Sequence, residues 1–111
     1  MKTRFIHNGD AIDYTPGEDT PAGTVVVVGE LVGVAKVDIK AGELGALHVR
    51  GVFDFPKATG GGSGSGMGIN IFWDESEQLA TQDADSGTNK LLGKAIAAAA
   101  DSDVIVRVRM S

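Results

Sequence analysis

Alternation of apolar and polar residues with a period of two is the feature that most constrains how this chain can fold. In the segment 47–55 the odd positions are apolar or Gly, and the even positions are mostly polar. The segment 104–110 alternates in the same way, with Arg107 and Arg109 on its polar side. Successive side chains of a β-strand point to opposite faces, so each segment predicts one half-buried strand.

Other segments extend this pattern. Residues 69–73 alternate as well, and Phe72 falls on their otherwise polar side, which we therefore expect to be covered. Residues 25–28 are four consecutive valines, whose branching at Cβ suits a strand and whose unbroken apolarity predicts burial on both faces. A two-residue break led by Gly29 separates them from 31–35, which fits a tight hairpin. Further short strands are expected at 4–8, 11–14, 35–40 and 78–82.

The segment 91–100 can be interpreted in two ways. It ends in the run Ala97 to Ala100, and Ala is the best helix former. Gly93 interrupts the segment, and about ten residues make a marginal helix unless they are packed. Propensity alone leaves a short helix and a strand open, and the family resemblance described below favours the strand.

The length of 111 residues predicts a single domain, 1–111, that can bury roughly two-thirds of its unfolded surface. Roughly eight to ten short strands separated by frequent turns are typical of an all-β fold, here a small barrel or a jelly-roll-like sandwich of antiparallel strands. The 16 glycines suit such turns. Residues 60–66, Gly-Gly-Gly-Ser-Gly-Ser-Gly, predict a flexible loop inside the domain. Residues 1–8 are expected to form an extended arm.

Charge excludes several classes of partner. Ten Lys and Arg residues stand against 15 Asp and Glu, a net charge of −5. This balance argues against nucleic acid, whose binding requires a basic face, and against an anionic membrane surface. The N-terminal residues lack the apolar stretch of a signal peptide, so we expect synthesis in a cytoplasm. With no Cys in the chain, disulfides and thiolate metal sites are excluded.

No motif predicts catalytic, cofactor-binding or metal-binding residues. The glycine-rich tract lacks the Lys of a phosphate-binding loop, because Met67 follows Gly66. Two histidines are too few for a three-histidine metal site. Two alternatives stay open: a small hydrolase using the acidic cluster from Asp74 to Glu77, and a carbohydrate-binding β module with Trp73 as its stacking platform. Trp73 lies on the apolar side of its strand, which favours core packing instead.

Six residues are candidate contacts with a partner. Lys2, Arg4 and Phe5 form a short basic and aromatic arm of the kind that is often ordered by a partner. Arg107 and Arg109 share one strand face, and Arg is enriched at interfaces because its planar fork makes paired hydrogen bonds. Phe72 joins them because it lies on a face that something is expected to cover.

The order of motifs along the chain resembles the head decoration, or capsid cement, proteins of tailed bacteriophages. The resemblance covers nearly the whole chain, and its most specific stretch runs from Gly51 to Gly60. The segments that carry it are Phe5–Asp10, Pro21–Gly29, Leu31–Ala35, Val52–Gly60, Ile71–Asp74, Leu92–Ala95 and Val106–Met110. The chain departs from the pattern at 60–66, where relatives tend to carry a loop with more side chains.

The resemblance implies a non-catalytic protein without a cofactor. It implies binding to the outer surface of an assembled phage head, across subunits of the major capsid protein, and stabilisation of the shell. Relatives act as small homo-oligomers, so the partners it implies are the major capsid protein and the chain itself. A homotrimer is favoured, and a homodimer is the other form. The expected location is the outer capsid surface of the virion.

Overall fold

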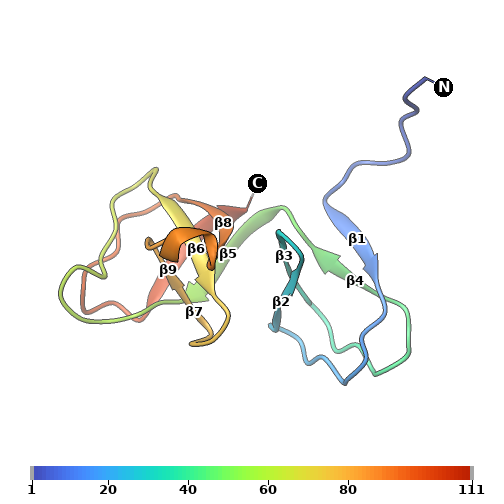
Figure 1. Ribbon diagram of the computed structural model, residues 1–111, viewed down its shortest axis with the longest axis horizontal. Helices are drawn as coiled ribbons and strands as arrows, with labels where there is room; N and C mark the ends of the chain where they lie inside the picture. The colour runs from blue at the N-terminus through green and yellow to red at the C-terminus, as the bar shows by residue number, and fades with distance from the viewer. Residues whose placement is uncertain (1, 111) are drawn as a thin grey trace.

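The computed structural model describes residues 2–110 and leaves Met1 and Ser111 outside. These residues form two antiparallel sheets with one 3-10 turn, η1 (Asp85–Gly87), which confirms the predicted all-β class. The first sheet, in the order β1-β4-β3-β2, contains β1 (Ala11–Tyr14), β2 (Val25–Val28), β3 (Leu31–Val34) and β4 (Gly45–His48). The second, in the order β5-β9-β8-β6-β7, contains β5 (Gly51–Pro56), β6 (Asn70–Asp74), β7 (Leu79–Thr81), β8 (Lys90–Ala95) and β9 (Ile105–Met110). The two sheets lie side by side in Figure 1.

The predicted hairpin is β2 and β3. Val25 pairs with Val34 and Val28 pairs with Leu31, and Gly29 turns the chain with a φ of 62°. The expectation that residues 25–28 are buried on both faces is wrong. β2 is an edge strand, so Val25 to Val27 are half-buried and Val28 is exposed.

The expected single strand 47–55 is two strands. β4 ends at His48 in the first sheet, and β5 begins at Gly51 in the second. Gly51 adopts a φ of 125°, a conformation that favours Gly because other residues carry a Cβ that clashes there. The chain changes sheet at this point without losing its apolar and polar alternation, which is why the sequence reads as one strand.

Two other expected strands are absent from the described residues. Residues 4–8 are exposed and belong to neither sheet. The segment 35–40 forms only an isolated bridge, in which the N–H of Ile39 donates to the carbonyl of Thr20 at 2.8 Å and the reverse bond is 2.7 Å. A segment with alternating apolar and polar residues forms no hydrogen-bonded β-ladder unless another strand lies beside it.

The helical alternative for 91–100 is wrong. β8 runs to Ala95 between β9 and β6, and its backbone groups pair with both neighbours. A Cβ at Gly93 would overlap the carbonyl oxygen of Arg109, so the close approach of β9 requires Gly at this place. Pairing on both sides makes the residues up to Ala95 a strand, and the alanines that follow lie outside β8, where Ala99 forms an isolated bridge with Ser65.

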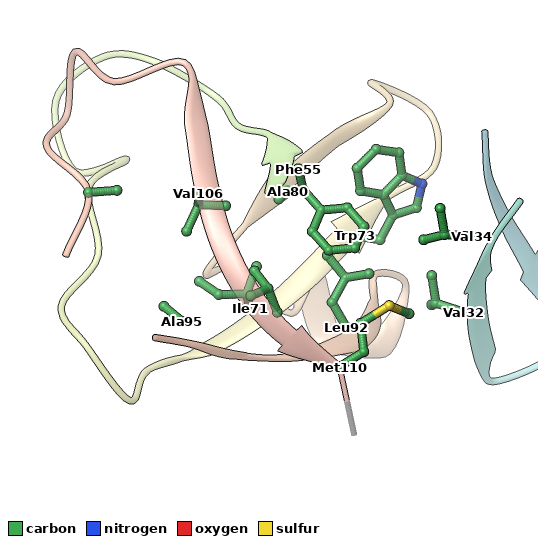
Figure 2. Packing of buried hydrophobic residues seen from close by; sticks show 12 residues of the cluster. Val32, Val34, Phe55, Ile71, Trp73, Ala80, Leu92, Ala95, Val106 and Met110 are labelled. Atoms are coloured by element: carbon green, nitrogen blue, oxygen red, sulfur yellow. The ribbon is translucent and has the colours of Figure 1, made fainter. Parts of the chain in front are cut away.

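The main core lies between the two sheets. Phe55, Trp73, Leu92 and other side chains from the inner face of the five-stranded sheet are almost fully buried there. Val32 and Val34 of β3 meet them from the first sheet, as Figure 2 shows. The rings of Phe55 and Trp73 are tilted by 57° with centroids 6.1 Å apart, an arrangement that favours aromatic pairs.

Lys57 is buried directly after β5, with 5% of its surface exposed. Its ammonium group donates hydrogen bonds to the carbonyls of Ala58 at 2.7 Å, Asp103 at 2.9 Å and Ala100 at 3.1 Å. A buried ammonium is tolerated only when its donors are satisfied, and here three acceptors serve three N–H groups. Lys57 therefore ties the end of β5 to the segment that leads into β9.

The glycine- and serine-rich segment 60–66 lies beside this lysine. Asp101 accepts hydrogen bonds from the N–H of Gly64 at 2.7 Å and of Gly62 at 3.3 Å. Gln82 donates to the carbonyl of Gly64 at 2.7 Å. The flexibility of 60–66 stays a prediction, and these bonds give a reason to expect less motion than composition alone indicates.

We predict that Lys57→Met lowers the free energy of unfolding by about 2–4 kcal/mol, because three backbone carbonyls lose the charged donor that is buried among them. Chemical denaturation measures the change. Lys40→Met is the matched control: Lys40 is exposed, so its loss should change stability by no more than about 0.5 kcal/mol. Equal effects of the two substitutions would contradict a structural role for Lys57.

Candidate functional site

The face of the five-stranded sheet that points away from the core is open to a partner. We call it the outer face. It carries charged, polar and apolar side chains, among them Val52, Asp54, Asn70, Phe72, Leu91, Lys94, Ile105, Arg107 and Arg109. A bulge in β8 keeps this face continuous, because Leu92 has no partner on β6 and turns inward.

An ion pair joins β5, an edge strand, to β9 on the outer face. Asp54 and Arg107 are directly opposite each other on β5 and β9. The Nε and Nη2 atoms of Arg107 donate to the two carboxylate oxygens of Asp54 at 2.9 and 3.1 Å. This paired hydrogen bond lowers the pKa of Asp54 and raises that of Arg107. Both groups are open to solvent, so the pair orients Arg107 more than it stabilises the fold.

Arg109 has a different environment two residues along the same strand. It lies opposite Val52 on β5 and Lys94 on β8. Lys94 is itself engaged, since its Nζ donates to the side-chain oxygen of Asn70 at 2.6 Å. Among residues 2–110, no side-chain hydrogen bond or ion pair involves Arg109, so its guanidinium donors are available to another molecule.

Apolar side chains flank these arginines. Val52 is 53% exposed and Ile105 is 51% exposed, and Leu91 lies opposite the half-buried Phe72. Apolar groups mixed with Arg are typical of protein interfaces. Phe72 could be identified from the alternation of its strand, whereas the other three were not predicted, although Val52 and Ile105 also interrupt the polar side of their strands.

The arm is separate from the outer face. Lys2, Arg4 and Phe5 are all exposed, and Phe5 has 78% of its surface in solvent. Figure 1 shows this segment leading away from both sheets before β1. The structure thus brings Phe72, Arg107 and Arg109 together on one face and leaves the three arm residues apart. A contact role for all six stays a prediction.

The acidic cluster after β6 forms a turn. The Oδ1 atom of Asp74 accepts hydrogen bonds from the Ser76 hydroxyl at 2.8 Å and from the Glu77 N–H at 3.1 Å. These bonds lower the pKa of Asp74, which keeps it ionised. Glu75 and Glu77 are exposed. The carboxylate of Asp74 therefore serves to close the turn between β6 and β7.

The sugar-binding alternative is wrong in its key residue. Only 2% of the surface of Trp73 is exposed, and its ring packs against Phe55. A buried indole offers no face for a sugar to stack on. Trp73 packs in the core, as the alternation of its strand favours.

Residues 2–110 contain no cluster of three or more His, Asp or Glu side chains placed to hold a metal ion. They also contain no helix with the length and apolarity needed to cross a membrane.

Comparison with known proteins gives one match. A model of the phage cement protein family matches residues 6–110. No curated protein and no solved structure matches the chain. The matched region contains every strand and the outer face, and it starts after Lys2, Arg4 and Phe5.

We predict that the carboxyl of Asp54 titrates below its ordinary pKa and that Arg107→Gln moves this pKa back up, because the paired hydrogen bond is lost. NMR titration of the side-chain carboxyl measures it. Since folding depresses this pKa, the pair's contribution to stability is present above the unfolded pKa and is lost as pH falls through the folded pKa. Arg109→Gln, two residues along the same strand, is the control and should leave the Asp54 titration unchanged.

Proposed function

Because the chain belongs to the phage cement protein family, we propose that it binds the outer surface of the assembled head, across neighbouring subunits of the major capsid protein, and stabilises the shell. In this proposal the protein carries out no chemistry and needs no cofactor. Its work is done by surfaces that are complementary to a closed protein lattice.

The outer face is the observation that carries this proposal. It presents exposed Val52 and Ile105 beside Arg107 and Arg109 on one rigid sheet. The ion pair with Asp54 already orders Arg107, so little side-chain entropy is lost when a partner covers it. Phe72 adds an aromatic ring that is half-covered by its neighbours and half-available.

The arm supplies a second contact in this proposal. Lys2, Arg4 and Phe5 are exposed and are free of either sheet, so a partner can order them. The family match begins at Ile6, and the arm would therefore make contacts that are particular to this chain and its own shell.

Stabilisation of the shell follows from the thermodynamic linkage between binding of this protein and closure of the shell. A protein that binds only where two shell subunits lie together favours the closed shell over the separated subunits. A standard interface buries roughly 1,200–2,000 Å². As a homo-oligomer, for which a trimer is favoured over a dimer, the protein would hold several subunits at once, and each further contact becomes intramolecular.

Heads lacking this protein test the proposal directly. We expect the purified chain to co-sediment with such heads, to appear on their outside by electron microscopy, and to raise the temperature at which they release DNA. Light scattering of the free protein gives its oligomeric mass. Failure to coat the heads, or location inside them with the genome, would defeat the proposed function.

Deletion of residues 2–6 tests the arm separately. We expect about a tenfold weaker apparent affinity for undecorated heads, since the arm's cations and aromatic ring are lost. A full-length variant with Lys2, Arg4 and Phe5 all changed to Ser is the matched control for chain length and should show the same loss. Unchanged occupancy in both variants would remove the arm from the interface while leaving the outer face in place.

A further inference from the structure

A groove of about 580 Å³ lies where the two sheets meet, beside the crossing from β4 to β5. We call it the junction groove. Its charged lining comes from separate parts of the chain: Lys36 follows β3, Arg50 stands between β4 and β5, and Arg109 belongs to β9. His48 and Asp10 complete the ionisable groups. The crossing strand is the green ribbon between the two sheets in Figure 1.

The groove is positive in a chain that is negative overall. It holds three of the ten Lys and Arg side chains but only one of the 15 Asp and Glu. That carboxylate, Asp10, lies 3.7 Å from Arg50, and both side chains are more than half exposed, so the pairing is weak. Among residues 2–110, neither Lys36 nor Arg109 has a side-chain partner.

Most Lys and Arg side chains outside the groove and the arm have hydrogen-bond or ion-pair partners within the chain. Lys57 is buried among carbonyls, Lys90 pairs with Glu30 at 3.1 Å, and Arg107 pairs with Asp54. The arm carries Lys2 and Arg4, and its last residue, Asn8, is part of the groove lining. The unpaired cations therefore lie mostly at the groove and in the arm, and Lys40 is the exception.

We propose that the junction groove binds an acidic peptide segment on the surface of the capsid shell, an inference that rests on the proposed function. Carboxylates accept paired hydrogen bonds from the forks of Arg50 and Arg109 and a single charged bond from Lys36. An open groove with donors from three parts of the chain suits an extended segment better than a single small ion. The net charge of −5 disfavours a phosphate backbone as the occupant.

The charge distribution also favours the shell over a second copy of this chain. Two copies, each with a net charge of −5, repel as they approach. A shell segment needs only local acidity to be attracted by the positive groove, and this attraction steers the molecule into one orientation before contact. This binding should weaken as salt rises, since exposed charges are screened.

Two single charge reversals in neighbouring positions test the proposal. Lys36 lines the groove and Lys40 does not, although both are exposed and belong to the same segment. Lys36→Glu and Arg50→Glu should each weaken binding to undecorated heads about tenfold, since attraction becomes repulsion. Lys40→Glu makes the same change in net charge and should bind like the wild type. Circular dichroism melts establish that all three variants fold.

The outcomes separate this inference from the proposed function. If the wild type binds heads and all three variants bind equally well, the groove proposal is overturned and the proposed function stands. If the wild type does not bind, the proposed function itself fails. A change in oligomeric mass confined to Lys36→Glu and Arg50→Glu would assign the groove to a second copy, and a mobility shift of DNA that these variants abolish would assign it to nucleic acid. Either result overturns the proposal.

Carbodiimide cross-linking of decorated heads identifies the occupant directly. The reagent joins an amine to a carboxylate in contact with it, with loss of water. We expect mass spectrometry to find Lys36 joined to an Asp or Glu of the shell subunit, with little such product at Lys40. Lys36 joined only to peptides of this chain would contradict the proposal.

Discussion

The packing of β3 against the inner face of the five-stranded sheet holds the two halves of this fold together. Val32 and Val34 enter the core formed by Trp73, Leu92 and Met110, and β8 is the strand of the second sheet that β3 mainly contacts. Burying two valines and the aromatic groups beside them stabilises this contact, at about 25 cal/mol per Å² of apolar surface removed from water. The junction groove depends on this arrangement, because its lining comes from both sheets.

Most strands of the fold could be predicted from the alternation of apolar and polar residues, because one face of each strand is buried and the other is not. The β2–β3 hairpin and the strand β9 could be predicted for this reason. The break between β4 and β5 could not, since the pattern of alternation continues through Gly51 while the backbone changes sheet. Propensity left a helix and a strand open at 91–100, and pairing on both sides of β8 decides the structure up to Ala95.

The candidate site was only partly predictable, because surfaces are assembled from distant segments. Arg107 and Arg109 could be placed on one face from their spacing, but their different partners depend on the register with β5. Lys57 was missed, although it follows Phe53 and Phe55 at alternate positions on the inward side. Its burial needs the carbonyls of Ala100 and Asp103, which no local pattern brings to it.

The division of charge leaves a positive groove on a protein that is acidic overall. The sheets place weakly paired or unpaired cations at their junction, and they neutralise Arg107 and Lys90 elsewhere through partners within the chain. In the proposed function, the acidic remainder of the surface keeps free copies apart. Apolar side chains on the outer face would contribute affinity without regard to orientation, whereas the positive groove would act directionally. Together they would let the protein dock in a single way on a repeating lattice.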